Sequence, residues 1–157
     1  MDYARSDWHW IMALALAFST GRAATHDIYP PPAHASGDVA AALVAATATH
    51  KRVILDFGGN WCPDCHILEG YFHDEPNMSI LEANYILVHV NIGRMNENLD
   101  IAERYQIPLR KGVPALAILG EHGELLYSQR TGEFEAMRGL KSSAVTEFLI
   151  RWKSTPA

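Results

Sequence analysis

The sequence predicts an α/β fold in which helices flank a central mixed β-sheet. Segments of helical and strand periodicity alternate along the chain, and the last two strand segments are joined by a turn signal. Alternation of this kind favours parallel strand pairs, and the turn adds an antiparallel pair. The 157 residues, of which 48% are hydrophobic and 20% charged, suit one domain with an extension.

The first 24 residues have the pattern of a targeting segment. Residues 8–18 (WHWIMALALAF) form an apolar run about half as long as the roughly 20 residues that a spanning helix needs. Small residues follow at 19–24, where a signal peptidase could cleave. We therefore expect a signal peptide or an uncleaved N-terminal anchor at 1–24 and no firm membrane span. The expected location is the periplasm or another extracytoplasmic space.

Residues 25–37 contain three consecutive prolines among small residues, which predicts an extended, polyproline-like linker. The folded domain is then expected at 38–153. Its first element is an Ala-rich helix at 38–50. A short apolar run at 52–57 (RVILDF), ended by two glycines, predicts a strand.

The next elements follow from periodicity. Apolar residues at helical spacing predict a helix at 62–73, and a shorter helix is expected at 76–83. The β-branched run at 85–92 predicts a strand. A polar helix with a few apolar residues is expected at 96–105.

The C-terminal part begins with a hairpin. Two strands at 113–119 and 124–127 are separated by Gly-Glu-His-Gly, a typical hairpin turn. An amphipathic segment at 142–153 predicts the last helix.

The only two cysteines of the chain lie in the pentapeptide Trp61-Cys-Pro-Asp-Cys65. A pair so close in sequence cannot cross-link distant parts of a fold, so its role is chemical. At the start of a helix, unpaired N–H groups and the helix dipole would favour a Cys62 thiolate, and Pro63 suits the first turn. Cys65, one turn on, could then attack a mixed disulfide on Cys62. A zinc site would need a second ligand pair, so no metal is expected.

His66 extends the motif to Cys-Pro-Asp-Cys-His, the pattern for covalent attachment of c-type haem. Met78, Met95 or Met137 could nominally serve as the second axial ligand. A covalent haem electron-transfer protein is therefore an alternative, although the motif follows a strand rather than lying in a mostly helical chain. His66 and His73, with Glu69 between them, are expected to be solvated helix residues.

Three motifs resemble the thioredoxin superfamily over about residues 38–153. They are Asp56-Phe57, Trp61-Cys62-x-x-Cys65 and Gly112-Val113-Pro114. The most similar members are periplasmic-facing thioredoxin-like domains of DsbD-type disulfide reductases. The resemblance implies a thioredoxin-like fold and a cis Val113–Pro114 bond.

The resemblance also implies roles for single residues. Asp56 would act as a base for Cys65, whereas a strand-end cap at Gly58 is the alternative. The backbone of Val113, beside Pro114, would pair with an extended substrate. Trp61 is expected to shield the sulfurs and pack beside a partner.

Two departures from the family pattern bear on proton handling and redox character. His89 lies where thioredoxin carries a lysine. Asp64 places a negative charge between the cysteines, which is expected to oppose a strongly oxidising character.

These observations predict a thiol–disulfide oxidoreductase that exchanges disulfides with protein substrates, in the reducing direction. It would need an electron-donor protein, because no flavin or nicotinamide fingerprint occurs, and no cofactor besides the Cys62–Cys65 pair. A formal net charge of −5 without a basic run argues against a nucleic-acid partner. A non-enzymatic thioredoxin-like module that binds a metal or a partner is the second alternative.

Overall fold

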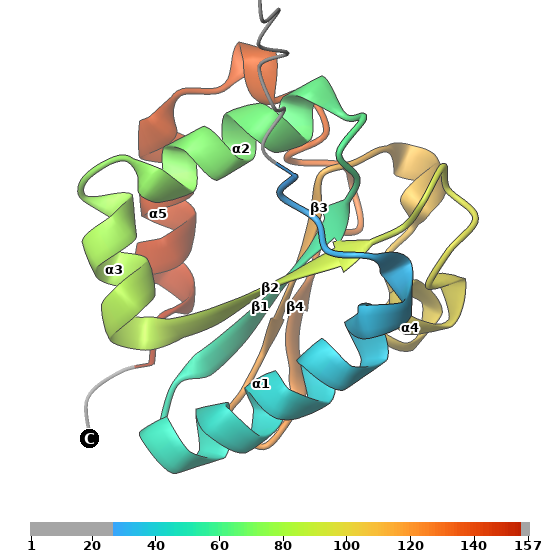
Figure 1. Ribbon diagram of the computed structural model, residues 1–157. Helices are drawn as coiled ribbons and strands as arrows, with labels where there is room; N and C mark the ends of the chain where they lie inside the picture. The colour runs from blue at the N-terminus through green and yellow to red at the C-terminus, as the bar shows by residue number, and fades with distance from the viewer. Residues whose placement is uncertain (1–26, 155–157) are drawn as a thin grey trace, which may run out of the picture.

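The computed structural model describes residues 27–154. A four-stranded sheet in the order β2-β1-β3-β4 forms the centre, with helices on both faces (Figure 1). The strands are β1 (Arg52–Gly58), β2 (Tyr85–Asn91), β3 (Ala115–Leu119) and β4 (Leu125–Ser128). The helices are α1 (Ala35–Thr49), α2 (Pro63–His73), α3 (Asn77–Asn84), α4 (Leu99–Arg104) and α5 (Ser142–Trp152). Short 3-10 turns are η1 (Pro32–His34), η2 (Leu109–Lys111) and η3 (Met137–Gly139).

The sheet is mixed, as the alternation of elements predicts. β1 runs parallel to β2 and antiparallel to β3, and β3 and β4 form an antiparallel hairpin. The hairpin turns at Gly123, whose φ of 85° lies in the left-handed region that glycine tolerates. β1 is therefore a central strand, and it is buried on both faces, which explains its continuous apolar run.

Alternate residues of the strands supply two separate cores. Leu55 and Phe57 of β1 pack with residues of α1 and α4 on one face. Ile54 and Leu116 pack with α2, α3 and α5 on the other. The redox motif lies where β1 ends and α2 begins.

The segment before α1 differs from the expected linker at 25–37, and α1 begins earlier than the expected helix. Tyr29 is buried, and its backbone exchanges two hydrogen bonds of 2.9 Å with the side chain of Asn60. Asn91 donates to the carbonyl of Pro30 and Asn98 to that of Pro32. Tyr29 and the prolines after it are therefore packed onto the domain, where three asparagine side chains form hydrogen bonds with their backbone.

The targeting segment expected at 1–24 lies outside the described residues. No helix within residues 27–154 is long and apolar enough to cross a bilayer.

Candidate active site

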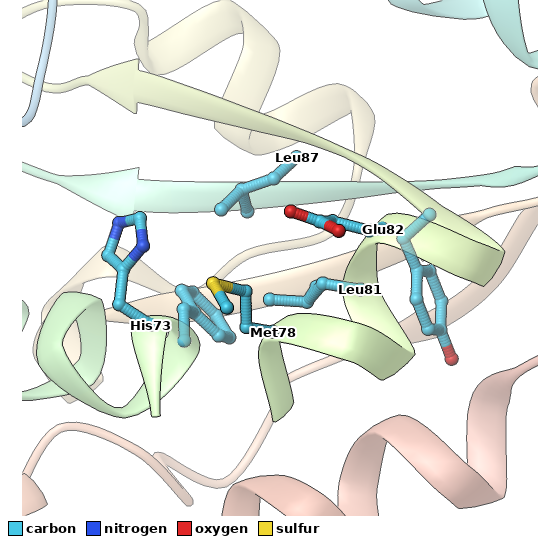
Figure 2. A pocket seen from close by; sticks show the side chains of 7 residues that line it. His73, Met78, Leu81, Glu82 and Leu87 are labelled. Atoms are coloured by element: carbon cyan, nitrogen blue, oxygen red, sulfur yellow. The ribbon is translucent and has the colours of Figure 1, made fainter. Parts of the chain in front are cut away.

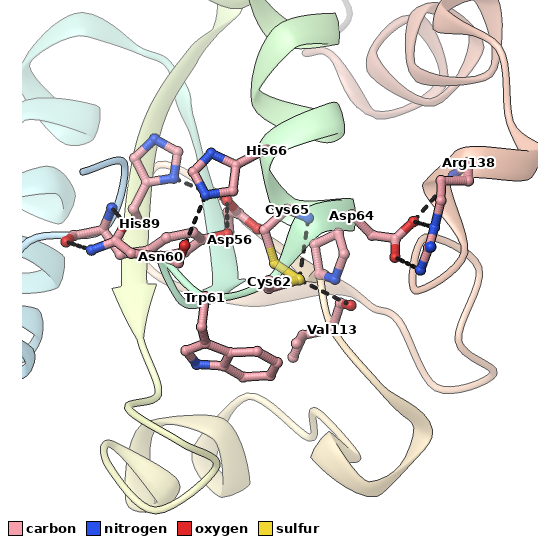
Figure 3. The surroundings of a disulfide bond; sticks show 12 residues. Asp56, Asn60, Trp61, Cys62, Asp64, Cys65, His66, His89, Val113 and Arg138 are labelled. Atoms are coloured by element: carbon pink, nitrogen blue, oxygen red, sulfur yellow. Dashed lines mark hydrogen bonds and ion pairs between the residues drawn. A yellow bond between two sulfur atoms is a disulfide. The ribbon is translucent and has the colours of Figure 1, made fainter. Parts of the chain in front are cut away.

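Cys62 and Cys65 form a disulfide at the start of α2 (Figure 3). Cys62 is the residue that caps the helix, with extended backbone angles, and Pro63 occupies the first helical position. The backbone N–H of Cys65 lies 3.2 Å from Cys62 Sγ and points at it. This sulfur thus occupies the position where helix N-termini stabilise negative charge. Both cysteines are buried, Cys65 completely.

The loop before β3 lies against the outer side of the disulfide. Cys62 Sγ is 3.6 Å from the carbonyl oxygen of Val113, and the Val113–Pro114 peptide is cis, as the resemblance implies. The ladder between β1 and β3 begins only at Ala115. The backbone of Val113 is therefore outside that ladder.

Trp61 is 41% exposed beside the cysteine pair. Its indole N–H donates to the carbonyl of Gly93, and the Arg94 guanidinium lies 5.6 Å from its ring centroid. The cation–π contact and the hydrogen bond fix the ring while one side stays in solvent.

Asp64 does not present the free charge that its position in the motif suggests. Its carboxylate lies 2.9 Å from the guanidinium of Arg138 and accepts the backbone N–H of Arg138 at 3.1 Å. These hydrogen bonds, chiefly the one from the side chain, lower the pKa of Asp64 against the effect of its burial. The positive charge of Arg138, which lies in η3, thus offsets the effect that the negative charge of Asp64 was expected to have on the Cys62 thiolate.

Asp56 lies behind the disulfide and is almost completely buried. Its Oδ2 accepts a 2.7 Å hydrogen bond from the Tyr29 hydroxyl and lies 2.9 Å from Nδ1 of His89 (Figure 3). Its Oδ1 has no hydrogen-bond partner. A buried carboxylate oxygen without a donor is costly, so this atom is open to a hydrogen-bond donor.

The Tyr29 hydroxyl and the inner cysteine lie over the same glycine. A Cβ atom on Gly58 would lie 2.3 Å from that hydroxyl and 2.7 Å from Cys65 Sγ. Both groups therefore share the space over Gly58, which only glycine leaves open. Burial, reinforced by the charge of Asp56, raises the pKa of Tyr29 well above its usual value, so the hydroxyl stays a donor.

The histidines of α2 are engaged away from the sulfurs. His66 Nε2 lies 2.8 Å from the carbonyl of Asn60, and His73 Nε2 lies 2.9 Å from Glu69. Covalent haem would require both cysteine sulfurs and His66 to face one open volume, whereas the sulfurs are bonded to each other and buried. Among the described residues, no group of three or more metal-ligating side chains converges.

A separate apolar hollow lies between α2, α3 and β2 (Figure 2). Met78 and Leu81 line its floor, and His73 stands at one end of it. Neither cysteine contributes to it.

Three residues of this site were not identified from sequence in these roles: Tyr29, Glu69 and Arg138. Tyr29 falls in the segment for which the sequence predicts a linker. Arg138 is 74 positions from Asp64, so no local sequence pattern connects Arg138 with Asp64. The position of Glu69 could be predicted in part, because it lies one helical turn after Cys65. In the structure it contacts His89 of β2.

Comparison with known proteins agrees with this geometry. The thioredoxin-like family model matches residues 33–120. A protein of Pseudomonas fluorescens named thiol:disulfide interchange protein DsbD is 34% identical over 121 residues, which are 73% of this chain and 18% of that protein. DsbD 2 of Pseudomonas aeruginosa is 30% identical over 115 residues, again 18% of its length. The chain thus spans less than a fifth of these relatives.

A crystal structure described as a disulphide isomerase from Xylella fastidiosa is similar over 95% of its chain and 79% of this one, with a TM-score of 0.74 and 28% identity. A structure named DsbH oxidoreductase shares the fold, with a TM-score of 0.55 and 20% identity. The chain therefore belongs to the thioredoxin-like family.

Proposed function

We propose that this domain reduces disulfides in protein substrates outside the cytoplasm, with Cys62 as nucleophile and Cys65 as resolving thiol. One observation carries the proposal: the pair caps a helix, and the buried carboxylate of Asp56 is hydrogen-bonded to the tyrosine that shares the space over Gly58 with the inner cysteine (Figure 3). The pair itself is the redox centre, and no further cofactor is required.

The reaction has two steps. The Cys62 thiolate attacks one sulfur of the substrate disulfide; the other substrate sulfur leaves as a thiolate and takes a proton from water. Asp56 then accepts the Cys65 thiol proton, Cys65 attacks Cys62, and the second substrate sulfur leaves. Two electrons pass to the substrate, and the Cys62–Cys65 disulfide forms.

The charges around the pair support the reducing direction. A negative charge near the sulfurs disfavours thiolate, and a less stabilised reduced form is a stronger reductant. Asp64 is paired one-to-one with Arg138. His89, in contrast, is shared by two carboxylates, Asp56 and Glu69, so the reducing direction is supported by the excess negative charge of that group. The potential is expected nearer to about −270 mV than to about −120 mV.

The surface beside Cys62 suits an extended polypeptide. The Val113 backbone lies outside the β1–β3 ladder and next to Cys62 Sγ, so it can pair with a substrate strand. Trp61, fixed but partly exposed, offers an apolar surface on the other side. The similarity to interchange proteins supports an upstream electron-donor protein, and the apolar segment at 8–18 supports export.

The test uses the reduced full chain with insulin as the disulfide substrate. Cys65→Ser is expected to accumulate a mixed disulfide through Cys62, whereas Cys62→Ser forms none, as read by mass spectrometry without reductant. Alkylation should label Cys62 before Cys65. Preferential labelling of Cys65 would reverse the assignment, and a wild-type chain that does not reduce insulin would favour a non-enzymatic binding module.

A further inference from the structure

Five polar side chains form a line from the rear of the disulfide to the surface. Tyr29 and Asp56 are at its buried end, His89 of β2 is in the middle, and Glu69 and His73 of α2 are at the outer end. They come from four separate parts of the chain, yet each lies next to the following one.

The distances make the line continuous. Asp56 Oδ2 is 2.9 Å from His89 Nδ1, and His89 Nε2 is 3.5 Å from Glu69 Oε2. Glu69 Oε1 is 2.9 Å from His73 Nε2. Glu69 Oε2 has no hydrogen-bond partner, and its 3.5 Å contact with His89 leaves it free to accept a proton from that imidazole.

The exposure of these side chains increases along the line. The Asp56 side chain is 2% exposed, those of His89 and Glu69 are each 18%, and that of His73 is 69%. Asp56 therefore meets water poorly, whereas His73 stands in solvent at the mouth of the hollow in Figure 2.

The charged groups around His89 are all carboxylates. Asp56 faces it from β1, Glu69 from α2 and Asp38 from α1 across a shallow hollow, while the Tyr29 ring packs edge-on at 5.2 Å. Burial alone would lower the pKa of His89, but the hydrogen bond to Asp56 and the charges of Asp56 and Glu69 outweigh it and raise the pKa. The two carboxylates thus favour the protonated imidazole.

We propose that His89 is a positioning residue of the resolving step, which links Asp56 through Glu69 and His73 to solvent protons. This inference rests on the proposed function. The cysteine chemistry does not explain how the buried Asp56 carboxylate exchanges protons with water. The inference assigns this role to His89, Glu69 and His73.

The proton balance is as follows. When Asp56 takes the Cys65 proton at Oδ1, its charge is neutralised and His89 loses that counter-charge. His89 then releases its Nε2 proton to Glu69 Oε2, Glu69 passes a proton from its carboxyl group to Nε2 of His73, and His73 releases one from Nδ1 to water. When the donor later reduces the disulfide, Asp56 returns its proton to Cys65 and His89 is reprotonated by the same route.

The experiment measures the two steps separately by stopped-flow mixing of reduced full-length protein with insulin. His89→Gln should leave the first attack intact, slow mixed-disulfide release on the order of 100-fold, and flatten its pH dependence. His73→Gln should slow release by a smaller factor in dilute buffer, with recovery on addition of imidazole, because position 73 is open to solvent.

The matched control is His50→Gln, which removes an exposed His–Glu pair of the same 2.9 Å length that is not part of the line. It should change neither step. Release by both His89→Gln and His73→Gln at the wild-type rate and pH profile would overturn the relay alone. Slowing of His73→Gln without imidazole rescue would also overturn it. Failure of the wild-type chain to attack insulin at all would instead overturn the proposed function.

Discussion

Asp64 lies between the cysteines in the sequence, and on charge alone it would oppose a thiolate at Cys62. In the structure Arg138 holds its carboxylate through both the guanidinium and the backbone N–H. The charge beside the redox pair is therefore set by a side chain far away in the sequence. This makes Arg138 a residue through which the reactivity of Cys62 can be adjusted.

Arg138→Gln is expected to lower the reactivity of Cys62, because Asp64 is left as an uncompensated charge. The pH midpoint for alkylation of reduced Cys62 should rise. The loss of stability should be at most about 1 kcal/mol, since the Arg138 side chain is 72% exposed. Arg151→Gln, which removes an arginine from α5, is the matched control; an equal shift there would show a general charge effect.

The same pair gives a stability test with a defined sign. The pKa of Asp64 is lowered in the folded state, so its contribution is present above the unfolded pKa of about 3.9 and is lost as the pH falls through the folded pKa. The stability difference between wild type and Arg138→Gln should therefore vanish in acid. Urea unfolding from pH 7 to pH 3 measures it.

The contribution of His89 to stability is expected to depend on pH in the opposite direction. Its pKa is raised in the folded state, so its contribution is full below the unfolded pKa of about 6.5 and is lost as the pH rises through the folded pKa. Wild type should lose stability relative to His89→Gln between pH 6 and the alkaline range. A constant difference across this range would show that the imidazolium charge is not involved.

At the scale of elements, the last residue of β1 allows Tyr29 and Cys65 to lie close together. Gly58 leaves space for the Tyr29 hydroxyl and Cys65 Sγ, which a Cβ would approach to 2.3 Å and 2.7 Å. Gly58→Ala should cost about 1–3 kcal/mol, because one of these groups must move. It should also slow mixed-disulfide release.

Gly70→Ala is the control for this substitution. A Cβ on Gly70 would have nothing within 4 Å, and the residue lies inside α2. Alanine there should stabilise the chain by roughly 0.5–1 kcal/mol. Thermal unfolding of both variants checks the pair of predictions, and a Gly58→Ala chain as stable as wild type would refute the close packing.

The helices and strands of the domain were predictable because each carries its own period. β1 at Arg52–Gly58 and α5 at Ser142–Trp152 differ from the expected ranges by a single residue at one end. The 3-10 turns were not predicted, since three residues hold no period. The start of α1 at Ala35 was missed because the prolines before it suggested an extended linker.

At the scale of the whole molecule, what could not be predicted is contact between distant segments. The cysteine pair is local, so its position at a helix start was predictable from the motif. The contacts of Tyr29 and of Arg138 join segments that share no periodicity and meet only after the sheet has formed. The resemblance to thioredoxins supplied Asp56, but it could not supply the tyrosine that bonds to it.

The segment before α1 also affects the order of events in folding. Their hydrogen bonds to Asp56, Asn60, Asn91 and Asn98 span 27, 31, 61 and 66 positions. Partners from so many parts of the chain must be in place first, so we expect this segment to dock late in folding although it is synthesised early.

Tyr29→Phe should therefore speed unfolding and leave the refolding rate unchanged, with a total cost of about 1–3 kcal/mol from the donor lost to Asp56. Stopped-flow folding in urea separates the two rates, and slower refolding would place Tyr29 in the folding nucleus instead. A late-docking tyrosine leaves the rear of Cys65 uncovered while the chain matures. During that interval the nascent pair can be oxidised or reduced before Tyr29 has docked on Asp56.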